Sequence, residues 1–83
     1  MSSDLTTAVR EILADHAGLD ADAATIAADA DLYDAGMTSH ASVNVMLAIE
    51  DELDVEFPDE LLQRSTFETV DSIVAAVSGL KEE

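Results

Sequence analysis

The sequence predicts an all-α protein, a small bundle of three main helices and one short helix, with a long loop between helix one and helix two. Three observations favour this fold class. Apolar side chains recur at helical spacing in three separate segments. The hydrophobic fraction is 48% with only one Tyr and two Phe, so aliphatic side chains must build the core, and these favour helix over strand. The 83 residues show no repeat or second domain, so residues 1–83 are expected to form a single domain.

The first helix is expected from about Asp4 to His16. Its apolar side chains recur at the spacing of one helical face, and these are Leu5, Ala8, Val9, Ile12 and Leu13. Gly18 follows closely, as is typical of a residue that ends a helix in the left-handed conformation.

Residues 17–38 show no sustained period and are expected to form a long loop, with one helical turn after Asp22. A loop of this length must be held down by its own side chains or serve a function. Leu19, Ile26 and Leu32 are the expected anchors.

The second helix is expected to begin after Thr38, a good N-cap residue, and to end near Asp54. Ser39 then lies in its first turn. The side chains expected on its buried face are Val43, Met46, Leu47, Ile49 and Leu53.

Pro58 breaks the chain and opens a short helix over Asp59 to Gln63. Ser65 and Glu68 have the spacing of a capping box, which predicts the start of the last helix there. The apolar face of that helix consists of Val70, Ile73, Val74, Val77 and Leu80.

The charge excludes several classes of partner. Nineteen acids against three basic side chains give a net charge of −16, which repels nucleic acid and anionic lipid headgroups. The chain has no cysteine, no apolar run long enough to span a membrane and no signal-peptide pattern, so a cytoplasmic protein is expected. No metal site is expected either, because the acidic stretches 20–25 and 29–34 lack the ligands and glycine that a calcium-binding loop needs at its later positions.

Ser39 is the candidate functional residue. A serine in the first turn of a helix lies beside free backbone N–H groups and the positive end of the helix dipole, which favour a phosphate ester on its side chain. The alternative is a serine that only assists the cap. We expect no catalytic residue and no enzyme activity, because His40 points about 100° away from its neighbour on a helix and a chain this short has no cleft to orient a substrate.

The segment from Asp31 to Pro58 resembles the core of the acyl carrier protein family. The shared features are an Asp-Leu pair, a serine at the start of the second helix, an apolar helix that ends in acids, and a Phe-Pro segment. In this chain they are Asp31-Leu32, Gly36, Thr38-Ser39-His40, Val43, Met46, Ile49, Glu50 and Phe57-Pro58. The resemblance implies that a phosphopantetheinyl transferase attaches 4'-phosphopantetheine to Ser39, and that the arm holds an acyl or aminoacyl group as a thioester.

The departures from this family pattern concern recognition. Thr38 and His40 replace the usual Asp and Leu, and Ala41 and Asn44 stand where many fatty-acid carriers have acids, while Glu50 and Asp51 keep the far half of the helix acidic. These six are the expected partner-binding residues. The pattern favours aminoacyl cargo over fatty-acid synthesis.

The implied partners are the transferase, an adenylating acyl or amino acid ligase and a downstream acceptor enzyme, and the carrier is expected to be a monomer. The alternative function is that of an acidic helical interaction module which acts by charge complementarity without a prosthetic group.

Overall fold

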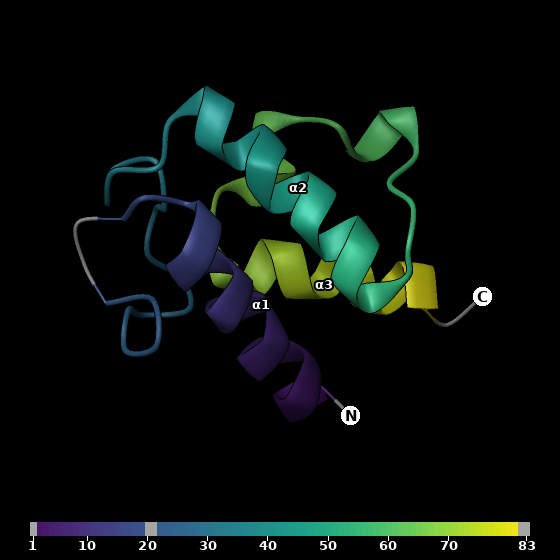
Figure 1. The fold of residues 1–83 in the computed structure, drawn as a ribbon, viewed down its shortest axis with the longest axis horizontal. Helices are drawn as coiled ribbons and strands as arrows, with labels where there is room; N and C mark the ends of the chain where they lie inside the picture. The colour runs from purple at the N-terminus through teal and green to yellow at the C-terminus, as the bar shows by residue number, and fades with distance from the viewer. Residues whose placement is uncertain (1, 20–21, 82–83) are drawn as a thin grey trace.

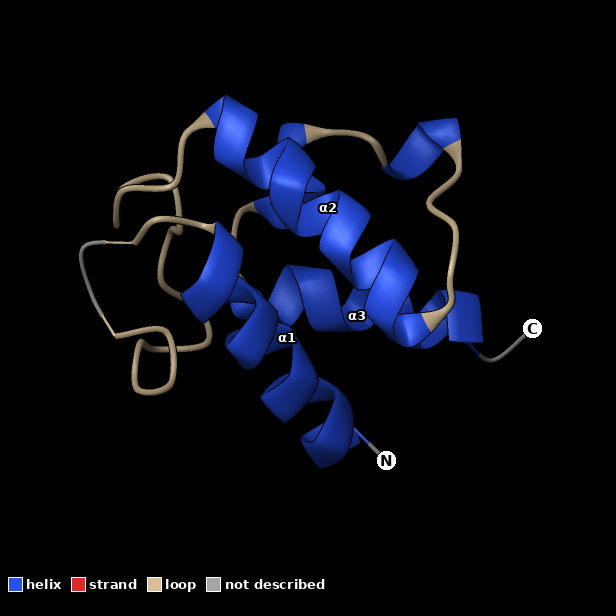
Figure 2. Ribbon diagram, viewed as in Figure 1, coloured by secondary structure: helices blue, strands red, loops and turns tan. Residues whose placement is uncertain are grey.

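The computed structural model describes residues 2–19 and 22–81, and these contain helices but no strand (Figures 1 and 2). The elements in chain order are α1 (Ser2–His16), α2 (Ser39–Leu53), the short 3-10 helices η1 (Asp59–Leu61) and η2 (Arg64–Phe67), and α3 (Val70–Lys81). The predicted all-α fold is therefore confirmed, with two short helices in place of one.

Helix α1 forms the centre of the packing, because it contacts both α2 and α3. The buried hydrophobic side chains come from all three helices and from the segments between them. They are Val9, Ile12, Leu13, Ala17, Ala23, Leu32, Met37, Val45, Ile49, Phe57, Phe67, Val70, Ile73 and Val77. The rings of Phe57 and Phe67 meet with centroids 5.4 Å apart, which joins the segment after α2 to η2.

Helix α1 begins two residues before the predicted start and ends at the predicted residue, His16. The Ala17 amide donates to the Leu13 carbonyl at 3.0 Å, and Gly18 has φ +67°. The left-handed glycine expected after this helix is therefore confirmed.

The long loop is folded against the rest of the chain. The Ile26 amide donates to the Asp22 carbonyl at 2.9 Å, which is the helical turn expected after Asp22. Leu32 is fully buried, and Leu19 and Ile26 pack against the core while partly exposed, so all three expected anchors hold the loop. The Leu32 amide also donates to the Glu68 carbonyl at 2.7 Å. The loop is thus fixed to the segment that precedes α3.

The buried face of α2 differs from the prediction. Val43 and Leu47 are 49% and 52% exposed, whereas Val45 and Ile49 are fully buried. Leu53 is partly buried, as is Met46. The prediction for Val43 and Leu47 was wrong because α2 is apolar around most of its circumference, so periodicity alone did not select the side that meets α1.

The start of α3 also differs from the prediction. Ser65 lies inside η2, and the helix begins only at Val70. The Ser72 amide donates to Thr69 Oγ1 at 2.9 Å and the Thr69 amide donates to Ser72 Oγ at 3.1 Å. Thr69 and Ser72 therefore make the reciprocal cap that was wrongly assigned to Ser65 and Glu68. The predicted short helix over Asp59 to Gln63 is present but ends at Leu61.

Candidate functional site

The N-terminus of α2 presents Ser39 to solvent. Thr38 has an extended backbone, and its Oγ1 accepts a hydrogen bond from the Ala41 amide at 3.0 Å, so the predicted N-cap is confirmed. Met37, only 2% exposed, anchors the loop just before the cap. A buried residue followed by a capped helix fixes the backbone on both sides of Ser39, while its side chain stays exposed.

The surroundings of Ser39 fit a phosphate ester. The first turn of α2 contains no acidic residue, and its backbone N–H groups lie at the positive end of the helix dipole. The hydroxyl of Ser42, one turn further, donates a hydrogen bond to the Ser39 carbonyl at 2.7 Å, whereas no hydrogen bond among the described residues uses the Ser39 hydroxyl. A bulky phosphodiester on Ser39 would therefore extend into solvent and displace no internal contact.

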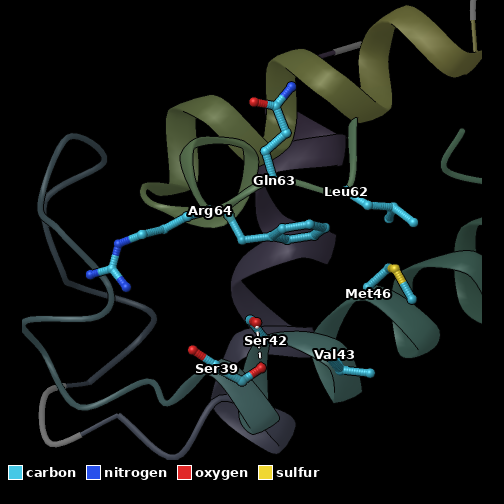
Figure 3. A pocket seen from close by; sticks show the side chains of 8 residues that line it. Ser39, Ser42, Val43, Met46, Leu62, Gln63 and Arg64 are labelled. Atoms are coloured by element: carbon cyan, nitrogen blue, oxygen red, sulfur yellow. Dashed lines mark hydrogen bonds between the residues drawn. The ribbon is translucent and has the colours of Figure 1, made fainter. Parts of the chain in front are cut away.

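Ser39 also lies at the edge of a pocket of about 360 Å³ between α2 and the segment around η2 (Figure 3). The lining side chains are mostly apolar or uncharged, and they are Ser39, Ser42, Val43, Met46, Leu62, Gln63, Arg64 and Phe67. Sequence analysis missed Leu62, Arg64 and Phe67 as neighbours of the serine, because they follow it by more than twenty positions and only the tertiary fold brings them there.

The six residues predicted to bind partners lie on or beside α2. Thr38, His40, Asn44 and Asp51 are exposed, and Ala41 is partly buried. Glu50 is partly buried as well, because its Oε2 accepts a hydrogen bond from the Phe57 amide at 2.9 Å. Glu50 therefore holds the chain after α2, and the partner-binding role of all six residues stays a prediction.

No hydrogen bond links His40 to Ser39 in the described part of the chain. Within residues 2–19 and 22–81, no group of three or more acidic or histidine side chains is arranged to hold a metal ion. The first of the two acidic stretches considered for calcium includes residues 20 and 21, which lie outside the described residues. None of the described helices is long and apolar enough to cross a membrane.

Comparison with known proteins relates this geometry to one family. The family described as having a phosphopantetheine attachment site matches residues 7–77. An aminoacyl carrier protein from Agrobacterium fabrum (strain C58) is 48% identical over 69 residues, which make up 83% of each chain.

Solved structures agree with the sequence comparison. One match comes from a crystal structure of an engineered Bradyrhizobium japonicum glycine:[carrier protein] ligase complexed with a carrier protein from Agrobacterium tumefaciens and AMP. The matching chain is 46% identical in sequence to this protein, with a TM-score of 0.84, and the match covers 88% of this chain and 97% of that one. A second match comes from a crystal structure of the Bradyrhizobium japonicum ligase complexed with glycylated carrier protein. The matching chain is 26% identical in sequence to this protein, with a TM-score of 0.74, and the match covers 88% of this chain and 97% of that one.

Proposed function

The chain belongs to the carrier-protein family defined by a phosphopantetheine attachment site, and from this premise we propose that Ser39 bears the arm and that the arm carries an aminoacyl group. The observation that supports the proposal most is the exposed Ser39 side chain on the capped, acid-free first turn of α2. A phosphopantetheine arm ends in a thiol, which holds a carboxylic acid as a thioester.

The chain's own residues present and orient the attachment point. The Thr38 side chain fixes the start of α2, and the helix dipole and free N–H groups of the first turn favour the negative phosphodiester. Tethering raises the effective concentration of the cargo at each partner's active site, so the domain itself need only present Ser39 and a docking surface. The proposed role is therefore delivery and not catalysis.

Aminoacyl cargo is favoured over fatty-acyl cargo for two reasons. The relatives are an aminoacyl carrier protein and carrier proteins complexed with a glycine:[carrier protein] ligase. Thr38, His40, Ala41 and Asn44 also leave the serine end of α2 without acids, which would disfavour partners that recognise acidic carriers. The proposed partners are a phosphopantetheinyl transferase, an adenylating amino acid ligase and a downstream acceptor enzyme. Since such loading consumes ATP, we place the protein in the cytoplasm.

A loading assay tests the cargo. The arm-bearing protein, made by co-expression with a phosphopantetheinyl transferase, is incubated with ATP, glycine and the Bradyrhizobium japonicum glycine:[carrier protein] ligase, and in parallel with a fatty acid ligase and its substrate. Intact mass should increase by one glycyl group in the first reaction and stay constant in the second. A fatty-acyl adduct without a glycyl adduct would contradict the proposed cargo. A protein that acquires neither arm nor cargo would favour the interaction module instead.

A further inference from the structure

The three basic side chains of this acidic protein are used in different ways. Arg10 is partly buried, and its Nη1 donates to the Ala23 carbonyl at 2.9 Å and to the Ile26 carbonyl at 2.7 Å. Lys81 donates its Nζ to the Leu53 carbonyl at 3.2 Å, at the opposite end of α2 from Ser39. Both of these cations thus have partners inside the chain.

Arg64 is exposed, and its guanidinium carbon lies 3.9 Å from the centroid of the Tyr33 ring. In the part of the chain that the structure describes, no hydrogen bond or ion pair uses its N–H groups. Stacking covers one face of the planar guanidinium and leaves the N–H donors at its edge free. Because the ring also restricts the side chain, Arg64 is a partly preorganised receptor for a carboxylate, which binds a guanidinium edge through two parallel hydrogen bonds.

The location of Arg64 connects this receptor with the attachment site. Arg64 and Ser39 line the same pocket, and Figure 3 shows the Arg64 side chain directed away from the pocket, towards the loop that precedes Ser39. Between Ser39 and Ile49 helix α2 contains no acid, so no carboxylate of that stretch competes for the guanidinium. Val43 and Leu62, 49% and 46% exposed, add apolar surface on the same pocket.

We infer that Arg64 is a specificity-determining contact for the loading ligase, and that its guanidinium binds a carboxylate on the ligase surface. Val43 and Leu62, at the other end of the same pocket, would pack against a separate apolar group of the ligase. The inference rests on the proposed function. An enzyme that recognises a carrier by basic groups near the serine would be repelled by this fixed cation, whereas a carboxylate would be attracted. The positive charge of Arg64 therefore both selects the proper ligase and rejects partners of acidic carriers.

Loading kinetics of arm-bearing variants test this inference. The probe is the Bradyrhizobium japonicum glycine:[carrier protein] ligase with ATP and glycine, and each variant is confirmed by intact mass to carry the arm before loading. Arg64→Gln should lower kcat/KM roughly tenfold, mainly through KM, and Arg64→Glu roughly a hundredfold at low salt. Arg64→Lys, which keeps the charge but loses the paired geometry, should lie between the wild-type and the Gln variant.

Two controls separate a docking contact from a structural or net-charge effect. Lys81→Gln makes the same change in net charge at the other end of α2 and should load within about twofold of the wild-type. The ratio of wild-type to Arg64→Gln rates should shrink as salt rises from 0.05 M to 0.5 M, because the Debye length falls from above about 10 Å to a few ångströms. A merely structural role for Arg64 would not produce that salt dependence.

The outcomes are distinct. The inference is overturned if Arg64→Gln loads like the wild-type at low salt, or if Lys81→Gln loses as much activity as Arg64→Gln. A wild-type protein that bears the arm but accepts no glycine would instead overturn the proposed aminoacyl cargo, and this inference with it.

Discussion

The Arg10 side chain gives the sharpest stability prediction. Its two hydrogen bonds to the Ala23 and Ile26 carbonyls join α1 to the long loop across 13 and 16 positions of sequence. Arg10→Met keeps an apolar stem but removes all the donors. Hydrogen bonds to charged groups contribute about 1.5–3 kcal/mol each. Because Arg10 is only partly buried, water can replace part of what is lost, and we expect a total loss of about 2 kcal/mol.

This loss is large on the scale of the domain. Stability of roughly 0.05–0.15 kcal/mol per residue gives about 4–12 kcal/mol for 83 residues. A loss of 2 kcal/mol should lower Tm by about 8–16 °C. Urea and thermal unfolding followed by circular dichroism measure the change, with Lys81→Met as the control that removes a cation from an exposed site.

Hydrogen exchange locates the effect. The Ile26 amide, which donates to the Asp22 carbonyl, should lose protection in Arg10→Met by at least as much as the helices do. An Arg10→Met protein no less stable than Lys81→Met would refute the reasoning, since it would mean that the loop does not depend on the guanidinium.

Three further changes test other parts of the structure. Gly79→Ala should stabilise the protein by about 0.5–1 kcal/mol, because Gly79 is exposed within α3 and an added Cβ meets nothing within 4 Å. Gly18→Ala should instead destabilise the protein by about 1–2 kcal/mol, because φ there is +67°. Urea unfolding measures both changes, and equal effects would contradict the backbone argument. Raising the ionic strength from 0.01 M to 0.1 M should raise Tm, because a net charge of −16 opposes compaction and salt shortens the range of the repulsion from about 30 Å to about 10 Å. A flat or falling Tm would mean that this repulsion is unimportant. The double variant Thr38→Asp, His40→Leu should keep the wild-type unfolding midpoint, since Asp also caps helices and both sites are exposed. The glycine:[carrier protein] ligase should nevertheless load the double variant more slowly than the wild-type. Equal loading rates for the two proteins would place recognition elsewhere.

The sequence predicted the features that depend on local interactions. The Thr38 cap, the left-handed Gly18 and the end of α1 each involve residues within four positions of one another, where the chemistry of one side chain decides the backbone. The exposed Ser39 at the start of α2 followed from the same local pattern.

The features that were missed depend on contacts distant in sequence. Val43 and Leu47 were placed in the core because the apolar pattern of α2 allows more than one face, and only packing against α1 selects Val45 and Ile49. The Arg64–Tyr33 stack joins η2 to the loop, thirty-one positions apart, and periodicity does not reveal such a pair. In the cap of α3 two candidate pairs of polar residues compete, and the structure selects Thr69 and Ser72 because η2 continues through Ser65.

The central claim is that Ser39 bears the phosphopantetheine arm, and the most direct test is mass spectrometry of three proteins co-expressed with a phosphopantetheinyl transferase. Ser42 provides a matched control, because it lines the same pocket but donates its hydroxyl to the Ser39 carbonyl. The wild-type and Ser42→Ala proteins should gain the mass of one arm, with fragmentation placing it on Ser39, and Ser39→Ala should gain none. An arm on Ser39→Ala, or a wild-type protein that stays unmodified, would contradict the account.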